Sequence, residues 1–169
     1  LSLHDALPIS GEERWSVGVG VFKDTKSKVK SVAGFRASPV VGQNSLSEYV
    51  YYVVNRLSDE GREKLGVSEN TDAAVIALRK EDGGIVWTCP VEGNGYSSPV
   101  AVYNEGGEGV IIQCCGNGTI LMLDGKTGRE RASLQLDGAI EASPAGDNNM
   151  MVIATSEKNK NNIYGIRIQ

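Results

Sequence analysis

The sequence predicts an all-β fold, part of a β-propeller of four-stranded antiparallel blades, and three observations predict it. Leu78 and Gly83 return as Leu123 and Gly128, each shifted by 45 positions. The pair Ser98-Pro99 returns as Ser143-Pro144 with the same shift. Each copy also contains short apolar, β-branched runs separated by Gly, Asn and Asp, which is typical of strands and tight turns. A period in this range is typical of repeat architectures in which each copy is one small unit.

Length and charge exclude several classes of function. The chain has 169 residues and a formal net charge of -4, with 17 basic and 21 acidic side chains. This balance gives no basic patch for nucleic acid, so we expect no nucleic-acid partner. No run of about 18 apolar residues occurs, so we expect no membrane-spanning helix.

Residues 1–10 resemble the translation of a sequencing adaptor, and we treat them as a non-native leader outside the fold. They contain His4, which is the single histidine of the sequence. Without it the chain offers no imidazole for nucleophilic catalysis or for a histidine metal site. We therefore predict no catalytic residue and no metal ligand.

The Ser-Pro pairs place the first strand of each blade. Proline has no N–H and a fixed φ, so it suits the start of a strand, where no ladder donor is lost. The expected first strands are 35–41, 95–101 and 140–146.

The second strand of each blade is a nearly continuous apolar run, as expected for a sheet covered on both faces. These runs are 49–54, 110–114 and 150–155. Third strands follow at 75–78, 120–123 and 163–166, and fourth strands begin after a glycine turn at 84–88 and 129–133. Gly11 to Trp15 repeats the Gly-x-x-x-Trp pattern of Gly83 to Trp87, which predicts one stray outer strand.

Residues 11–169 are therefore expected to be the C-terminal part of a single propeller. The predicted blades cover about 34–92, 93–138 and 139–169, the last without its fourth strand. Such a fragment would have open sheet edges, and we expect it to aggregate or unfold in isolation. The remaining blades would come from a missing N-terminal part.

The Ser-Pro start, the strand ending Ala77-Leu78 and the Gly83-x-x-x-Trp87 turn together resemble the pyrroloquinoline-quinone (PQQ)-type propeller repeat. This family contains quinoprotein alcohol dehydrogenase-like propellers and outer-membrane assembly lipoproteins. The resemblance implies an extracytoplasmic location and tryptophans that pack between blades. Ala132 replaces one such tryptophan, which predicts a looser or differently filled contact. The positions that carry the repeat are Trp15, Ser38, Pro39, Leu78, Gly83, Trp87, Ser98, Pro99, Leu123, Gly128, Ser143 and Pro144.

Two long connections break the repeat. The first blade carries about 15 extra residues, the polar stretch 55–72, and the connection from Trp15 to Ser38 is also long. Both connections should emerge at the same end of the sheet and lie side by side, the earlier one as a hairpin with a basic tip. Loops on a rigid scaffold often carry function, although a surface elaboration without a partner is an equal alternative. The candidate interaction residues are Lys23, Lys26, Lys28, Arg56, Asp59, Glu60, Arg62 and Glu63.

The adjacent Cys114 and Cys115 are candidate cofactor contacts, because the resemblance includes dehydrogenases in which neighbouring cysteines lie against the quinone. The alternative is that both are reduced and face opposite sides of a strand. Cys89 and this pair do not have zinc-like spacing.

Two functions remain in competition. The first is a non-catalytic PQQ-like propeller that binds a protein, peptide or glycan through a loop-rich face, with no cofactor in this part of the chain. The second is a piece of a quinone-dependent dehydrogenase, which would use PQQ and calcium. The fold alone does not decide between them.

Overall fold

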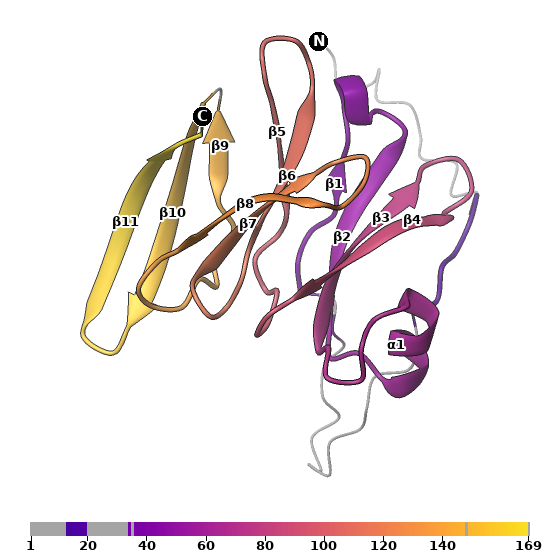
Figure 1. Ribbon diagram of the computed structural model, residues 1–169, viewed down its shortest axis with the longest axis horizontal. Helices are drawn as coiled ribbons and strands as arrows, with labels where there is room; N and C mark the ends of the chain where they lie inside the picture. The colour runs from indigo at the N-terminus through magenta and orange to yellow at the C-terminus, as the bar shows by residue number, and fades with distance from the viewer. Residues whose placement is uncertain (1–12, 20–33, 35, 148, 169) are drawn as a thin grey trace, which may run out of the picture.

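The structure, a computed structural model, describes residues 13–19, 34, 36–147 and 149–168. Three antiparallel sheets fan out side by side (Figure 1). The first contains β1 (Val40–Val41), β2 (Tyr49–Asn55), β3 (Ala73–Arg79) and β4 (Ile85–Val91). The second contains β5 (Val100–Tyr103), β6 (Gly109–Cys114), β7 (Thr119–Asp124) and β8 (Glu130–Gln135). The third contains β9 (Ala145–Asp147), β10 (Met150–Glu157) and β11 (Lys160–Arg167).

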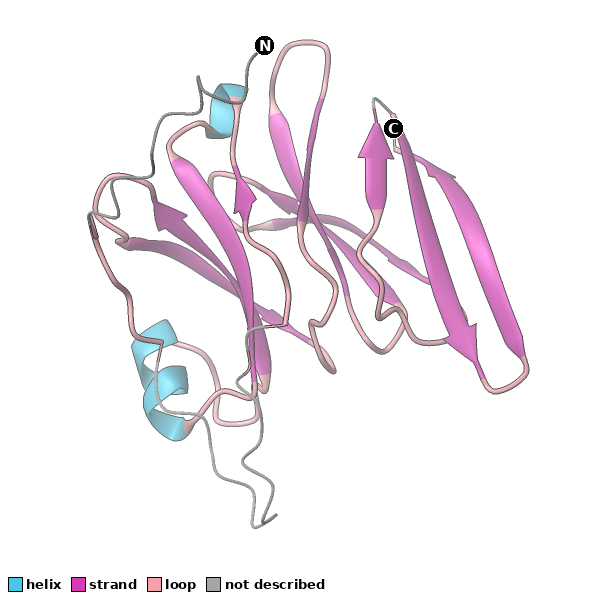
Figure 2. Cartoon of the chain, turned by 180° about the vertical axis from the view of Figure 1, so that it is seen from behind, coloured by secondary structure: helices cyan, strands magenta, loops and turns pink. Residues whose placement is uncertain are grey.

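Each sheet is a meander, because strands that follow one another in the chain pair with one another. The predicted all-β fold of propeller blades is thereby confirmed. Two short helices interrupt the first sheet, α1 (Asp59–Leu65) between β2 and β3 and the 3-10 helix η2 (Asn44–Leu46) between β1 and β2. They lie at opposite ends of that sheet (Figure 2).

Two strand predictions need correction. The first strands are shorter than expected, because β1 begins only after Pro39 and β5 only after Pro99. The predicted outer strand at 11–15 is also wrong for the residues that are described, since 13–19 contain no strand. A strand needs a partner ladder, and no described strand pairs with this segment.

Three apolar clusters hold the sheets together. One fills the space between the first two blades and includes Tyr51, Trp87 and Leu123. Another lies between the second and third blades and includes Ile112 and Met151. The third covers the outer face of the first blade. Both faces of the inner strands β2, β3 and β6 are thus largely buried, as their nearly continuous apolar sequences predicted. In contrast, β8 is exposed along its whole length, and β10 alternates between buried and exposed residues, so that run is covered on one face only.

Trp87 makes the central contact between the first two blades. Its side chain is 9% exposed, and its indole Nε1 donates a hydrogen bond to the carbonyl of Gly125 at 3.0 Å. The ring lies on Gly128, where an added Cβ would come within 2.6 Å of it. Gly128 also has a φ of 72°, so both space and backbone conformation require glycine there.

Trp15 repeats this arrangement one blade earlier. Its Nε1 donates to the carbonyl of Lys80 at 2.8 Å, and its ring lies on Gly83. The Gly-x-x-x-Trp pattern therefore identified the correct packing role for Trp15, although the segment forms no described strand.

Ala132 occupies the position on β8 that Trp87 occupies on β4. Met122 pairs with Ala132 in the same way that Ala77 pairs with Trp87. Ala132 borders a mainly apolar pocket of about 170 Å³ between the second and third blades. The contact is therefore looser than the one around Trp87, as the substitution predicted.

The Ser-Pro serines also connect consecutive blades. The backbone N–H of Ser38 donates to Oγ of Ser98 at 2.8 Å, and that of Ser98 donates to Oγ of Ser143 at 2.9 Å. Ser38 and Ser98 thus donate their N–H groups to the next blade rather than to their own sheet. This geometry explains why the serine recurs together with the proline.

Asp124 organises the turn between β7 and β8, as expected for an aspartate in a tight turn. Its Oδ1 accepts bonds from the N–H groups of Lys126 and Thr127 at 3.0 and 2.9 Å, and its Oδ2 pairs with Arg131. Partial burial raises the pKa of Asp124, but the bonds from Arg131 and Thr127 outweigh it and lower the pKa to about 2.

Replacing Trp87 by alanine should lower the free energy of unfolding by about 3–5 kcal/mol, because it opens a cavity between two blades. Urea denaturation of the whole protein, purified as its own cells make it, measures the change. The control is Val86→Ala on the same strand, where the side chain is 38% exposed and the expected loss is below about 1 kcal/mol. Equal losses for both variants would contradict the central role of Trp87.

Asp124→Asn should destabilise the chain by about 2 kcal/mol at most near neutral pH, since it keeps the turn acceptor but removes the charge. The folded pKa is lowered, so this stabilisation is present above the ordinary value of 3.8 and disappears as the pH falls through about 2. Denaturation of both proteins between pH 7 and pH 2 should show the two stabilities converging at acid pH. A constant difference would refute the ionic contribution.

Candidate functional site

The long 55–72 connection contains α1, which the sequence analysis treated as a polar loop. Oγ of Ser58 accepts the N–H of Gly61 at 3.0 Å, so Ser58 caps the helix N-terminus. Asp59 and Glu60 lie in the first turn, where carboxylates favour helix formation. Gly66 ends the helix in the left-handed conformation, with a φ of 64°. The capping residues Ser58 and Gly66 are the sequence signal from which this helix could have been predicted.

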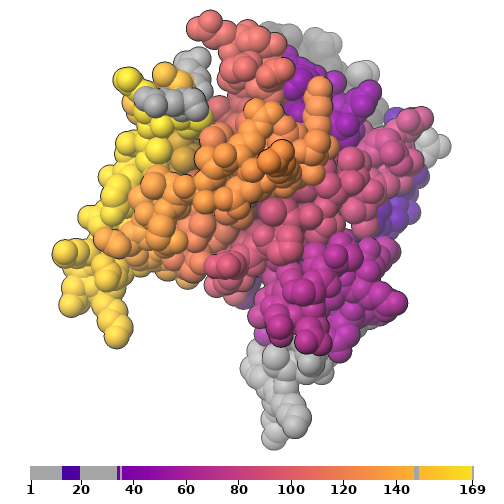
Figure 3. All heavy atoms as spheres, in the orientation of Figure 1, coloured from indigo at the N-terminus to yellow at the C-terminus, as the bar shows by residue number. Residues whose placement is uncertain are grey.

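The connection is packed into the outer cluster of the first blade. Leu57 and Leu65 are 2% and 5% exposed and lie in one cluster with Val19. Lys64 Nζ also donates to the carbonyl of Gly18. The two long connections therefore touch, as predicted, where they are described. Figure 3 shows the α1 region as a lobe at the lower end of the first blade.

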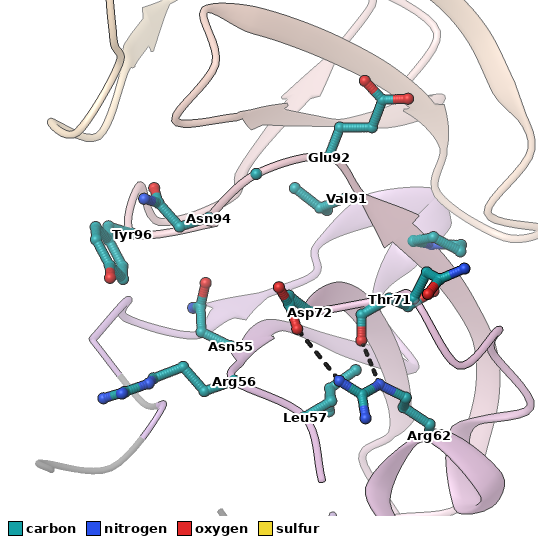
Figure 4. A pocket seen from close by; sticks show the side chains of 13 residues that line it. Asn55, Arg56, Leu57, Arg62, Thr71, Asp72, Val91, Glu92, Asn94 and Tyr96 are labelled. Carbon is teal, nitrogen blue, oxygen red and sulfur yellow. Dashed lines mark hydrogen bonds and ion pairs between the residues drawn. The ribbon is translucent and has the colours of Figure 1, made fainter. Parts of the chain in front are cut away.

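An open pocket of about 690 Å³ lies where this connection meets the link between β4 and β5 (Figure 4). Two separate chain segments thus form its walls, and both leave the same end of the first blade. Polar and apolar surface contribute about equally to its lining, which comprises Asn55, Arg56, Leu57, Arg62, Asn70, Thr71, Asp72, Pro90, Val91, Glu92, Gly93, Asn94 and Tyr96.

Asn55 fixes the base of this pocket. The side chain is 1% exposed, and its Oδ1 accepts the N–H of Gly95 at 2.7 Å while its Nδ2 donates to the carbonyl of Gly95 at 3.0 Å. Its backbone N–H donates to the carbonyl of Gly34 at 3.1 Å. Through its side-chain amide and its backbone N–H, Asn55 therefore links the connection that enters the first blade to the connection that enters the second.

Arg62 braces the wall formed by the 55–72 connection. Its guanidinium bonds to the carbonyl of Thr71 at 2.8 Å, to Asp59 at 2.7 Å and to Asp72 at 3.2 Å. These bonds occupy the guanidinium of Arg62 within the protein. Arg62 and Asp59 therefore chiefly stabilise the wall of the pocket. Glu60 and Glu63 are exposed on α1 and do not line the pocket.

Arg56 differs from Arg62 in both backbone and side chain. Its φ is 58°, in the left-handed region that non-glycine residues avoid. The conformation follows from its neighbours, because Asn55 and Leu57 on either side are both buried. No described residue forms an ion pair or a hydrogen bond with its guanidinium.

Two further side chains define the wall on the β5 side. Tyr96 borders the pocket, and the guanidinium of Arg36 lies over its ring at 4.7 Å from the centroid. Oδ1 of Asn94 is enclosed and accepts no hydrogen bond from the described protein. The sequence analysis did not select Tyr96 or Asn94, because neither belongs to an insertion or to a repeated motif.

The three candidate lysines, Lys23, Lys26 and Lys28, lie outside the described residues. Of the other five candidates, Arg56 and Arg62 line the pocket and Asp59 supports it. The structure thus brings part of the predicted set together, with pocket residues that the prediction did not contain.

The cysteines are free, and the adjacent pair faces two different clusters. Cys115 packs between the first and second blades, whereas Cys114 packs between the second and third. Burial raises the pKa of each thiol to about 12, so both are protonated and poorly nucleophilic at neutral pH. In these positions the two thiols present no shared surface to a quinone.

Other cofactor sites are not evident in the described part of the chain. There, no group of three or more His, Cys, Asp or Glu side chains could hold a metal ion. The quinone and calcium of the dehydrogenase alternative stay a prediction. No helix among the described residues is long and apolar enough to cross a membrane.

The blades, their period and their tryptophan contacts define a β-propeller built from PQQ-like repeats. A family model described as outer membrane protein assembly factor BamB matches residues 71–168, more than half of the chain. The chain therefore belongs to this family of PQQ-like propeller repeats, as the resemblance predicted.

Solved structures support the fold. BamB from Moraxella catarrhalis superposes with a TM-score of 0.51 at 14% identity, covering 82% of this chain and 35% of that one. A europium-containing methanol dehydrogenase superposes with a TM-score of 0.50 at 16% identity, covering 72% of this chain and 21% of that one. The chain thus spans about a third of the length of the BamB structure. No curated protein matches the sequence significantly.

Replacing Asn55 by alanine should lower the free energy of unfolding by about 1–3 kcal/mol, because it leaves buried backbone groups of Gly95 without partners. Asn70→Ala is the matched control, since Asn70 lines the same pocket but is exposed. Urea denaturation should show a change below about 0.5 kcal/mol for the control. Similar values for the two variants would show that Asn55 does not link the connections.

Proposed function

We propose that the chain is part of a non-catalytic propeller that binds a partner through the face that carries the 55–72 connection. The binding site is the pocket between this connection and the link from β4 to β5. The partner class is a protein, a peptide or a glycan, as the sequence analysis proposed.

The left-handed Arg56 carries this proposal. A non-glycine residue in this conformation costs roughly 1–2 kcal/mol, and glycine would remove that cost. The chain instead places a long cationic side chain there, at the rim of a pocket and without a partner in the described protein. Strain of this kind concentrates at sites that bind ligands.

Family membership supports a binding role and an extracytoplasmic location. The matching family model is described as an outer membrane protein assembly factor, a role in assembly rather than in chemical conversion. We extend both the role and the location to this chain as parts of the proposal.

The whole 55–72 connection cannot be excised to test this function, because Leu57 and Leu65 belong to the core. Photo-crosslinking avoids that problem, because it can be carried out on the intact protein in the cells that normally make it. A benzophenone side chain at Glu92, on the exposed rim, should give adducts that mass spectrometry identifies. The control site is Glu81, which is exposed in the β3–β4 turn and does not line the pocket. Equal adducts at both sites, or none at Glu92, would contradict the proposed site.

Arg56→Gly should separate binding from stability. The free energy of unfolding should rise by about 0.5–1 kcal/mol as the strain is relieved. The yield of the crosslinked adduct at position 92 should fall. Arg129→Gly, at an exposed arginine of the second blade, should leave the adduct unchanged. A stable Arg56→Gly protein with an undiminished adduct would show that Arg56 has no part in binding.

A further inference from the structure

We infer that the ligand of this pocket is a polypeptide segment with charges of both signs, whose acidic side chain pairs with Arg56 and whose basic side chain approaches Glu92. The inference rests on the proposed function and specifies the ligand that the same pocket selects.

The charges of the lining lead to this conclusion. Four of the described lining residues are charged, and two of them, Arg62 and Asp72, already form a 3.2 Å ion pair, in a cluster that Asp59 joins at 2.7 Å from Arg62. Arg56 and Glu92 remain, each without an ion pair to a described residue. They come from different walls, and Figure 4 shows them on opposite sides of the lining, each with its charged end turned outward from the other side chains. A complementary ligand therefore carries an acidic and a basic group that are separated from each other.

The uncharged part of the lining suits a peptide backbone. Asn70 and Asn94 contribute side-chain amides to the lining, and an amide group can hydrogen-bond to a main-chain N–H or C=O of a bound segment. Leu57 and Val91 add a buried apolar base that can contact a side chain or the Cα groups of an extended segment. The volume of about 690 Å³ lies within the usual range of ligand pockets.

A neutral glycan fits this lining less well. Among the described lining residues Tyr96 alone is aromatic, and Arg36 already covers one face of its ring at 4.7 Å. A neutral sugar also has no charge to pair with Arg56 or Glu92. The pocket belongs to a connection that lengthens the first blade alone, so its specificity is a property of this chain rather than of the repeat.

The test uses the whole protein, purified as its own cells make it, and a displayed library of random dodecapeptides. Selected peptides should contain an acidic and a basic residue at a recurring spacing, and the synthetic peptides should bind in fluorescence anisotropy. Arg56→Glu should weaken binding at least tenfold. Exchanging the acidic residue of the peptide for lysine should then restore binding to the Arg56→Glu protein. Arg129→Glu should change the affinity less than twofold.

A second variant keeps the test decisive if the Arg56→Glu protein fails to fold. Glu92→Lys reverses the other charge, and a peptide whose basic residue is replaced by glutamate should rescue it. The thermal unfolding midpoint of each variant, compared with the wild type, shows which proteins are folded. Selection of uncharged peptides, no selection at all, or no rescue in either folded variant would overturn the inference.

The outcomes also distinguish this inference from the proposed function. If neutral oligosaccharides on an array bind the wild type and lose binding in Tyr96→Ala, the pocket is a binding site but the peptide inference is wrong. If peptides are selected without a charge requirement while Glu92 still gives adducts in cells, the binding function stands and the inference falls. If charged peptides bind equally well to all pocket variants and Glu92 gives no adduct, both are wrong.

Discussion

The packing of the first blade onto the β7–β8 turn of the second is the contact on which the rest of the structure depends. Three side chains of the first blade meet at Gly125. Tyr51 and Trp87 both donate hydrogen bonds to its carbonyl, at 2.9 and 3.0 Å, and Leu46 lies where a Cβ of Gly125 would be. A side chain at Gly125 would displace Leu46, so glycine allows the two sheets to approach each other. This approach sets the spacing between blades and buries the apolar faces that neither sheet can cover alone.

The candidate site is a consequence of that spacing. Asn55, at the end of β2, bonds at 2.7 Å to Gly95, which lies in the link that leads from the first blade into the second. Its amide then joins two connections that are 40 positions apart in the sequence. The base of the pocket is therefore as rigid as the interface between the blades. Specific recognition benefits from such rigidity, because a preformed site loses less conformational entropy when it binds.

The parts of the fold that local patterns determine were predictable from the sequence. Strand positions followed from apolar runs and turn glycines, and the packing of tryptophan between blades was implied by the family resemblance. The pocket was not predictable in this way, because Asn55 and Asn94 become neighbours only through the packing of two sheets. α1 was missed for a different reason. Its seven residues are largely polar, and their apolar anchors, Leu57 and Leu65, are too few to show a helical period. The serine links between blades were also hidden, because the repeat of Ser-Pro was explained by the proline alone.

At Arg56, the packing of the two neighbouring residues determines the backbone conformation, whereas the side chain adds a charge that the packing does not require. The burial of Asn55 in the interface and of Leu57 in the outer cluster requires the chain to turn inward on both sides of a single position. That position must adopt the left-handed conformation, and its side chain must point outward. A purely structural solution is glycine, which adopts this conformation without strain. Arginine adopts this conformation at the cost of backbone strain, and it adds a charge that forms no ion pair with the described residues. Under the function that we propose, a bound partner pairs with this charge, which would explain why the position keeps arginine despite the strain.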